Sequence, residues 1–220
     1  DNKIDIRRED KAIRPFTIDP HQDIPLEVIS LSSVTVIKNH EPKEMACDVV
    51  LKRGEHLQIV GPNGIGKTTL LESLAGGTAT GEEVAKGVKI GYYRQDFSNL
   101  DFNKSVFETL MDSMKKKLEE EMRSIAAGFL LFGDVMKSKV GDLSEGQKGL
   151  VAFAKLRMEE PGLLILDEPT NHINFRHIPV IAEALNQYKG AMILVSHVPE
   201  FVEQIRIDDV LDLSKLKPKK

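Results

Sequence analysis

One stretch of the chain decides the expected fold: Gly61-Pro62-Asn63-Gly64-Ile65-Gly66-Lys67-Thr68. It fits the pattern G-x-x-x-x-G-K-[ST] at every required position. The run HLQIV precedes it and TTLLESLAG follows, as expected for a strand that turns into a helix. Glycines let successive backbone N–H groups converge on an anion, and the helix N-terminus adds partial positive charge. The stretch therefore predicts a phosphate-binding loop in preference to a glycine-rich turn without chemistry.

The loop also carries side chains suited to a nucleoside triphosphate. Lys67 is expected to reach the β- and γ-phosphates, and Thr68 to supply a hydroxyl to Mg²⁺. The amides of residues 61–69, with Thr69 as the last, are predicted to form a nest around the phosphates.

A pair of carboxylates follows a fully apolar run further along the chain. Leu163–Leu166 reads as a buried strand and ends in Asp167 and Glu168. At the carboxyl edge of a parallel sheet such residues lie beside the phosphate loop. Asp167 is predicted to hold Mg²⁺, directly or through water, and Glu168 to act as general base on the attacking water. A solvated loop is the alternative for an Asp-Glu pair taken alone.

Two further polar residues stand at predicted strand ends. Gln95 follows the strand VKIGYY and is expected to contact the metal or the water, with a plain surface glutamine as the alternative. His197 follows MILVS and is expected to hydrogen-bond the γ-phosphate and hold the water in line. A histidine with a purely structural role is the alternative there.

Apolar strands that alternate with helices predict an α/β fold with a mostly parallel core sheet covered on both faces. Antiparallel strands are expected near the N-terminus, together with a small inserted helical lobe. We assign residues 26–97 and 141–214 to the nucleotide-binding core and residues 98–140 to the lobe. Residues 1–25, punctuated by prolines, are expected to form an extended linker, and the basic tail 215–220 to fray.

Inside the lobe, apolar residues recur every fourth position from Val106 to Met122. This spacing predicts one amphipathic helix over residues 105–125. A coiled coil is the alternative, but five turns suit a helix of a small lobe better.

Composition limits the class of protein. The 220 residues, 41% of them hydrophobic, suit one globular domain. A net charge of −4 does not suggest direct DNA binding. Cys47 is the single cysteine, which fits a reducing, cytoplasmic compartment. No stretch approaches the roughly 20 apolar residues that span a bilayer, so a membrane role would depend on a partner subunit.

Taken in order, these motifs resemble the ATP-binding cassette (ABC) family over residues 27–213. Residues 61–69 resemble its Walker A, Gln95 its Q-loop, and LLILDEPTNH its Walker B running into the D-loop; Ser196-His197 resembles its switch histidine. The resemblance implies binding of ATP and Mg²⁺ and hydrolysis of ATP to ADP and phosphate.

The resemblance also includes the family's signature motif, Leu143-Ser144-Glu145-Gly146-Gln147. In this family each nucleotide lies between the Walker A of one cassette and the signature motif of another. Ser144, Gly146 and Gln147 are therefore implied to contact a nucleotide that a second cassette holds. That second cassette is implied to lie in the same protein or in an ATP-dependent homodimer.

Three segments narrow the resemblance to the ABC-F subfamily: FLLFGDVMKSKVGDLSEGQKGLVAFAKL, DEPTNHIN and SHVPEF. Members of this subfamily pair two ATPase domains on one chain without a membrane domain and act as ribosome-associated translation factors. Residues 1–25, called here the leader, then resemble the end of the linker that joins the two cassettes. The rest of the chain resembles the second cassette. The alternatives are the ATPase subunit of a membrane transporter and a nucleotide switch without turnover.

Several positions depart from the family's pattern. Glu145 replaces the usual second glycine of the signature, and Asn174 stands where the D-loop aspartate is usual. No aromatic residue lies between Val28 and Lys38, where these proteins stack the adenine, and His40 is a weak substitute. The missing aromatic residue argues against strong adenine selectivity. Asn174 is expected to weaken the contact between the two cassettes.

Overall fold

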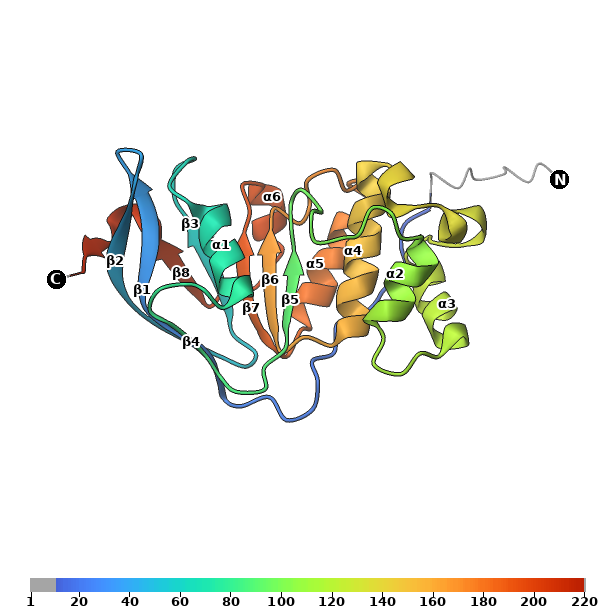
Figure 1. Ribbon diagram of the computed structural model, residues 1–220, viewed down its shortest axis with the longest axis horizontal. Coiled ribbons are helices and arrows are strands. Elements are labelled where there is room, and N and C mark those ends of the chain that lie inside the picture. Colours follow the sequence, from blue (N-terminus) through green and yellow to red (C-terminus); the bar gives the residue numbers. More distant parts are fainter. Residues whose placement is uncertain (1–10, 220) are drawn as a thin grey trace.

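The computed structural model describes residues 11–219, and within this range a parallel five-stranded sheet forms the centre of the fold (Figure 1). The strand order is β5-β6-β7-β3-β8. Its members are β3 (His56–Val60), β5 (Ile90–Tyr93), β6 (Leu163–Asp167), β7 (Ala191–Val195) and β8 (Asp209–Asp212). The predicted α/β fold with a parallel core is confirmed.

An antiparallel sheet stands beside this core at the end of the molecule opposite the helical lobe (Figure 1). Its order is β4-β1-β2-β9, with β1 (Glu27–Lys38), β2 (Glu41–Lys52), β4 (Glu82–Val84) and β9 (Lys217–Pro218). Asn39 and His40 turn the chain between β1 and β2 with φ of 53° and 63°, the backbone of a tight two-residue hairpin. Strand β2 thus begins at Glu41, directly after the turn.

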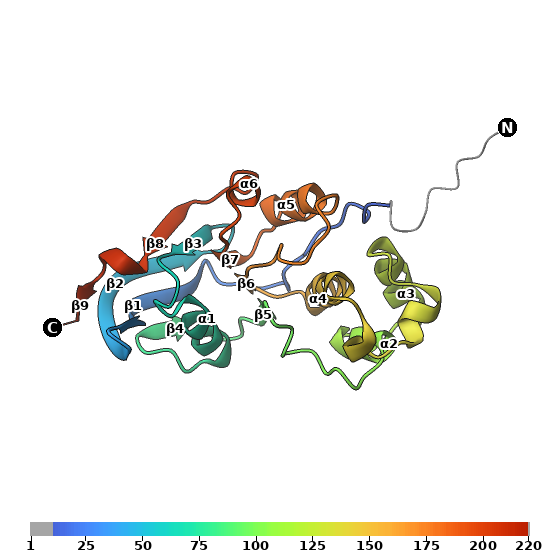
Figure 2. The ribbon, with the colours of Figure 1, turned by 90° about the horizontal axis from the view of Figure 1, so that it is seen from above.

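Helices cover the core sheet on both sides. Figure 2 shows α1 (Lys67–Gly76) on one side of the sheet and α5 (Ile178–Asn186) with α6 (Pro199–Val202) on the other. Helix α4 (Glu145–Glu159) packs on α2 (Val106–Ser113) and α3 (Glu119–Gly128) of the lobe. Short 3₁₀ turns lie at η2 (Gly133–Lys137), η3 (Val140–Asp142) and η4 (Leu213–Lys215).

Strand β6 divides the apolar interior into two cores. Leu164 and Leu166 join the core shared by α4, α5 and the lobe. Leu163 and Ile165 point the other way, into the core between α1 and the β1–β2 hairpin. Successive residues of a strand face opposite sides, so a parallel strand covered on both faces must be apolar throughout. This explains why LLIL precedes the carboxylates.

The prediction of one helix over residues 105–125 was wrong, because the chain forms two. Helix α2 ends at Ser113, Met114 follows in extended backbone, and α3 begins after Leu118, which is 53% exposed. The charges between them explain the break: three lysines follow the C-terminus of α2, and Glu119–Glu121 form the first turn of α3. Cations favour a helix C-terminus and carboxylates an N-terminus, so this sequence suits two helix ends.

The leader packs against the domain over its described part. Residues 1–10 of the predicted linker lie outside the described residues; from Lys11 the backbone is irregular, as expected, but Ile13, Phe16 and Ile18 are buried in the core of α4, α5 and the lobe. The Phe16 ring lies 4.7 Å from that of Phe129, centroid to centroid. An extended segment that buries three large side chains acts as part of the core.

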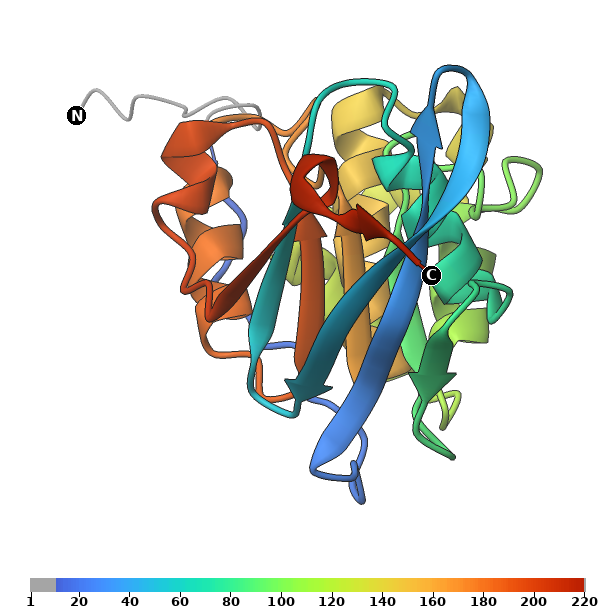
Figure 3. The same ribbon diagram turned by 90° about the vertical axis from the view of Figure 1, so that its left-hand side faces the viewer.

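The basic tail also differs from expectation in its described part. Lys217–Pro218 forms β9 against Met45 and Ala46 of β2 (Figure 3), and the Lys219 ammonium lies 2.7 Å from the Glu44 carboxylate. The edge of β2 therefore has a partner strand, and an ion pair holds the tail beside it. The sequence KLKPKK alone gives no sign of this pairing.

Burial of the leader has a measurable consequence. We expect Phe16→Ala to lower the free energy of unfolding by about 3–5 kcal/mol, because it leaves a cavity between the leader and the lobe. Phe175→Ala is the matched control, since that ring is 73% exposed and the same atoms are lost. Urea unfolding followed by circular dichroism measures both. Equal small effects of the two substitutions would show that the leader does not contribute to the core.

Candidate functional site

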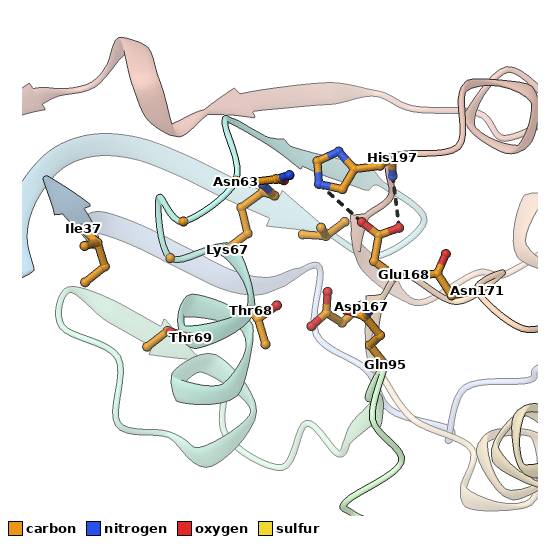
Figure 4. Close-up of a pocket in the computed structure, with 13 residues that line it drawn as sticks. Ile37, Asn63, Lys67, Thr68, Thr69, Gln95, Asp167, Glu168, Asn171 and His197 are labelled. Atoms are coloured by element: carbon orange, nitrogen blue, oxygen red, sulfur yellow. Dashed lines mark hydrogen bonds and ion pairs between the residues drawn. The ribbon is translucent and has the colours of Figure 1, made fainter. Parts of the chain in front are cut away.

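The order of the core strands brings distant motifs to one edge of the sheet. Strands β6, β7 and β3 are neighbours and β5 flanks β6, all of them parallel, so their carboxyl ends lie together. The polar residues that follow those ends surround a cavity of about 520 Å³ (Figure 4). Its lining residues are Ile37, Asn63, Gly64, Gly66, Lys67, Thr68, Thr69, Gln95, Asp167, Glu168, Asn171, Val195 and His197.

The glycine-rich loop owes its shape to backbone conformations that glycine favours. Gly64 and Gly66 have φ of 81° and 99°, and Gly66 directly precedes α1. A side chain at Gly66 would also approach Ile37, since an added Cβ would lie 3.3 Å from its Cγ1. The Ile37 N–H donates to the Ile65 carbonyl at 2.9 Å. The β1–β2 hairpin thus braces the loop from outside.

Lys67 lies inside the curve of the loop. Its side chain is largely buried, and its ammonium donates to the carbonyls of Gly61 at 2.7 Å and Pro62 at 3.1 Å. Gly61, Pro62 and Ile65, which the sequence assigned to nucleotide binding, do not line the cavity. Gly61 and Pro62 hold the lysine, and Ile65 packs into the core beneath the loop.

Asp167 is a buried carboxylate, and neither of its oxygens has a hydrogen-bond partner. Burial raises the pKa of this carboxyl, and the nearby Thr68 hydroxyl opposes the rise without reaching hydrogen-bond geometry. Buried carboxylates are stabilised by cations, and oxygen atoms are the ligands that Mg²⁺ prefers. Asp167 and Thr68, with Gln95 beside them, therefore fit a bound Mg²⁺ ion.

Glu168 stands next to Asp167 but has different partners. One of its carboxylate oxygens accepts the backbone N–H of His197 at 3.1 Å, and the other lies 3.5 Å from the imidazole Nε2 (Figure 4). Its backbone has φ of 48°, in the left-handed region that residues with a side chain seldom adopt. Burial raises the pKa of Glu168, and the contacts with His197 oppose the rise. A carboxylate with a raised pKa suits proton transfer near neutral pH.

Gln95 is exposed at the mouth of the cavity, on the chain that leaves β5. The neighbouring Arg94 pairs with Glu72 of α1 and, at 3.1 Å, with Asp96. These ion pairs tie the segment that carries the glutamine to the helix of the phosphate loop. Gln95 thus lines the same cavity as Thr68 and Asp167, beside which it was expected to contact the metal or the water.

The signature residues lie elsewhere. Ser144 caps α4: its hydroxyl accepts the N–H of Gln147 at 3.2 Å, and the Gln147 side chain accepts the N–H of Ser144 at 3.0 Å. Ser144, Gly146 and Gln147 line a separate cavity of about 500 Å³, together with residues of the loop 172–177. The structure therefore does not bring these three residues to the phosphate loop.

Three residues of the first cavity were not predicted: Ile37, Asn171 and Val195. Ile37 comes from a hairpin far from the motifs in sequence, and its apolar side chain carries no chemical signal. Asn171 could have been found, because it follows the two carboxylates by a few residues. His40 does not line the cavity; among the residues of the β1–β2 turn region, Ile37 takes that place.

Comparison with known proteins identifies the family to which the chain belongs. The profile of the family described as ABC transporter matches residues 45–171. The chain belongs to this family. It is an ATPase domain of the cassette type.

The relatives narrow the type of cassette. The chain is 36% identical over 192 residues to the ATP-binding protein YdiF of Bacillus subtilis, covering 86% of this chain and 30% of that protein. It is 40% identical over 152 residues to ATP-binding cassette sub-family F member 2 of the mouse, covering 67% of this chain and 24% of that protein. The cassette is thus most like those of the ABC-F subfamily. It spans less than a third of the length of these two relatives.

Solved structures show the same fold. The post-hydrolysis dimer of the cassette MJ0796, bound to ADP and Pi, superposes with a TM-score of 0.66 at 22% identity, over 87% of this chain and 99% of that one. Between residues 11 and 219, no helix has the length and apolar character needed to cross a membrane.

The raised pKa of Glu168 predicts how activity depends on pH. A general base must be ionised, so we expect the turnover of ATP to fall as pH drops through this raised pKa, at a higher pH than for an exposed glutamate, whose pKa is about 4.3. Turnover measured between pH 5 and 8, with circular dichroism to verify folding, tests this. His197→Ala should move the acid limb to higher pH, because it removes a contact that lowers the Glu168 pKa. If turnover in that variant no longer falls at low pH, the group that titrates is the histidine and not Glu168.

Proposed function

We propose that this chain binds ATP and hydrolyses it to ADP and phosphate as one half of a two-cassette sandwich, within a protein of the ABC-F type. One observation carries the proposal: the phosphate loop with its carboxylates lines one cavity, and Ser144, Gly146 and Gln147 of the signature motif line another. Each cavity holds only part of the groups that a triphosphate needs. A second cassette would complete both.

The first cavity contains the groups for the chemical step. The amides of the glycine-rich loop and the Lys67 ammonium bind the phosphate oxygens. Glu168 accepts a proton from the attacking water, and His197, whose backbone and imidazole contact its two oxygens, keeps the carboxylate in place. Thr68, Asp167 and Gln95 would hold Mg²⁺, which when bound neutralises phosphate charge.

The second cavity contains groups for the far side of a triphosphate. Because the Ser144 hydroxyl already accepts the Gln147 N–H, its own proton is available for a phosphate oxygen. The N-terminus of α4 adds backbone N–H groups that have no carbonyl partner within the helix. Gly146 lies against the loop that follows the carboxylates, where an added Cβ would meet the His172 carbonyl at 3.0 Å. A phosphate bound here would therefore also contact the loop that follows Asp167 and Glu168.

This arrangement couples hydrolysis to assembly. A γ-phosphate that contacts two cassettes stabilises their closed pair, and its loss after hydrolysis removes those contacts. The contact between Glu168 and His197 and the raised Glu168 pKa favour turnover over a nucleotide switch without catalysis.

The sandwich predicts assembly that depends on ATP. We expect Glu168→Gln to bind ATP without hydrolysing it and to form a homodimer on size-exclusion chromatography only when ATP is present. Glu203→Gln, at an exposed position of the same chemistry, should remain a monomer because it turns ATP over. A monomer with and without ATP in the Glu168 variant would contradict the proposal, as would a dimer that ignores ATP.

We further propose that the full-length protein acts on the ribosome, as the likeness to sub-family F suggests. The competing function, ATPase subunit of a membrane transporter, has the same chemistry and a different partner. The full-length protein carrying Glu168→Gln, loaded with ATP, should sediment with purified ribosomes and not with membrane vesicles from the same cells. Sedimentation with the vesicles alone would favour the transporter.

A further inference from the structure

The cavity beside the signature residues, called here the signature cavity, is built from four parts of the chain. The N-terminus of α4 contributes Ser144, Gly146 and Gln147, and the loop after β6 contributes His172, Asn174 and His177. Apolar residues of the lobe complete one wall. Leu150 of α4 also lines the cavity, and the last lining residue is Lys11, from the leader. Nothing in the motif pattern accounts for a lysine at this place.

Among the residues that the structure describes, the signature cavity is lined by a lysine and by no acidic side chain. The chain as a whole, in contrast, carries a net charge of −4. Glu145, the acidic residue inside the signature motif, lines a different cavity with Thr68 and Arg94. Its carboxylate lies 2.7 Å from the Lys148 ammonium, so its charge is matched within α4. The Lys11 ammonium therefore makes the signature cavity attractive to anions.

Hydrogen bonds hold the leader near this lysine. The Ile13 N–H donates to Nδ1 of His177 at 3.2 Å, and the Arg14 N–H donates to the carbonyl of Gly128 at 2.9 Å. Ile13 and His177 are both buried, and burial lowers the pKa of His177, which favours the neutral ring. Because Nδ1 accepts the Ile13 N–H, it is the nitrogen of that ring without a proton. The backbone is therefore tied two residues away from Lys11, while the Lys11 side chain itself is exposed.

We propose that Lys11 is a further ligand of the triphosphate that the signature residues contact on the second cassette. Its ammonium would donate a charge-assisted hydrogen bond to a phosphate oxygen, next to the Ser144 hydroxyl and the first amides of α4. The leader thereby supplies the cation of a half-site whose own motif carries a glutamate. This inference rests on the proposed sandwich and adds to it a residue outside the signature motif.

The test measures how much ATP is needed to assemble the dimer. In the Glu168→Gln background, we expect Lys11→Ala to raise the ATP concentration for half-maximal dimerisation by about tenfold, the low end for a hydrogen bond between charged groups. Lys11→Arg should restore assembly. Binding of a fluorescent ATP analogue to the monomer should not change, because that nucleotide sits on the phosphate loop.

Arg14→Ala is the matched control. It removes the same charge from the same leader, and Arg14 does not line the signature cavity. We expect its half-maximal ATP concentration to stay within about twofold of the parent, well below the tenfold expected for loss of a charged hydrogen bond. If Lys11→Ala needs no more ATP to dimerise than the parent Glu168→Gln protein, the role of Lys11 is wrong and the sandwich stands. The same holds if Arg14→Ala raises the half-maximal ATP concentration as much as Lys11→Ala does. Absence of a dimer in the parent would overturn both proposals.

Discussion

The buried carboxylate of Asp167 is the constraint on which the site depends. Both its oxygens lie out of solvent without a hydrogen bond, at the end of a strand that is apolar on both faces. Burying a charge without compensation costs several kcal/mol, so this position is stable only as a protonated acid or beside a cation. Lys67 does not pair with it: the Lys67 ammonium donates to the carbonyls of Gly61 and Pro62, and the Asp167 oxygens have no hydrogen-bond partner. The site is thus suited to a metal ion that arrives with a nucleotide.

The same constraint shapes the neighbouring residues. Glu168 turns away from Asp167 through a left-handed backbone, and its carboxylate meets His197 at the end of the next strand. Two adjacent carboxylates therefore have separate environments: one open to a cation, the other held by a backbone N–H and an imidazole. Separate environments allow one carboxylate to bind a cation and the other to take a proton.

The leader contacts both the helical lobe and the loop that follows the carboxylates. It packs its apolar side chains between the lobe and α5, and it hydrogen-bonds to His177 at the start of that helix. The loop between Glu168 and His177 joins the catalytic carboxylates to the signature cavity. The hydrogen bond between Ile13 and His177 joins the leader to the end of this loop.

The sequence by itself determined the phosphate loop, the carboxylates at the end of β6 and the parallel core, because each depends on local pattern: glycine spacing, or an apolar run before polar residues. Tertiary structure alone decided which residues line each cavity. Strand order placed Gln95, Glu168 and His197 around one cavity and left Ser144 in another. Tertiary packing also decided that Phe16 is buried, that Lys217 pairs with β2, and that Ile37 lies against the phosphate loop. Those contacts join residues far apart in the chain, and their side chains have no local spacing that reveals a partner.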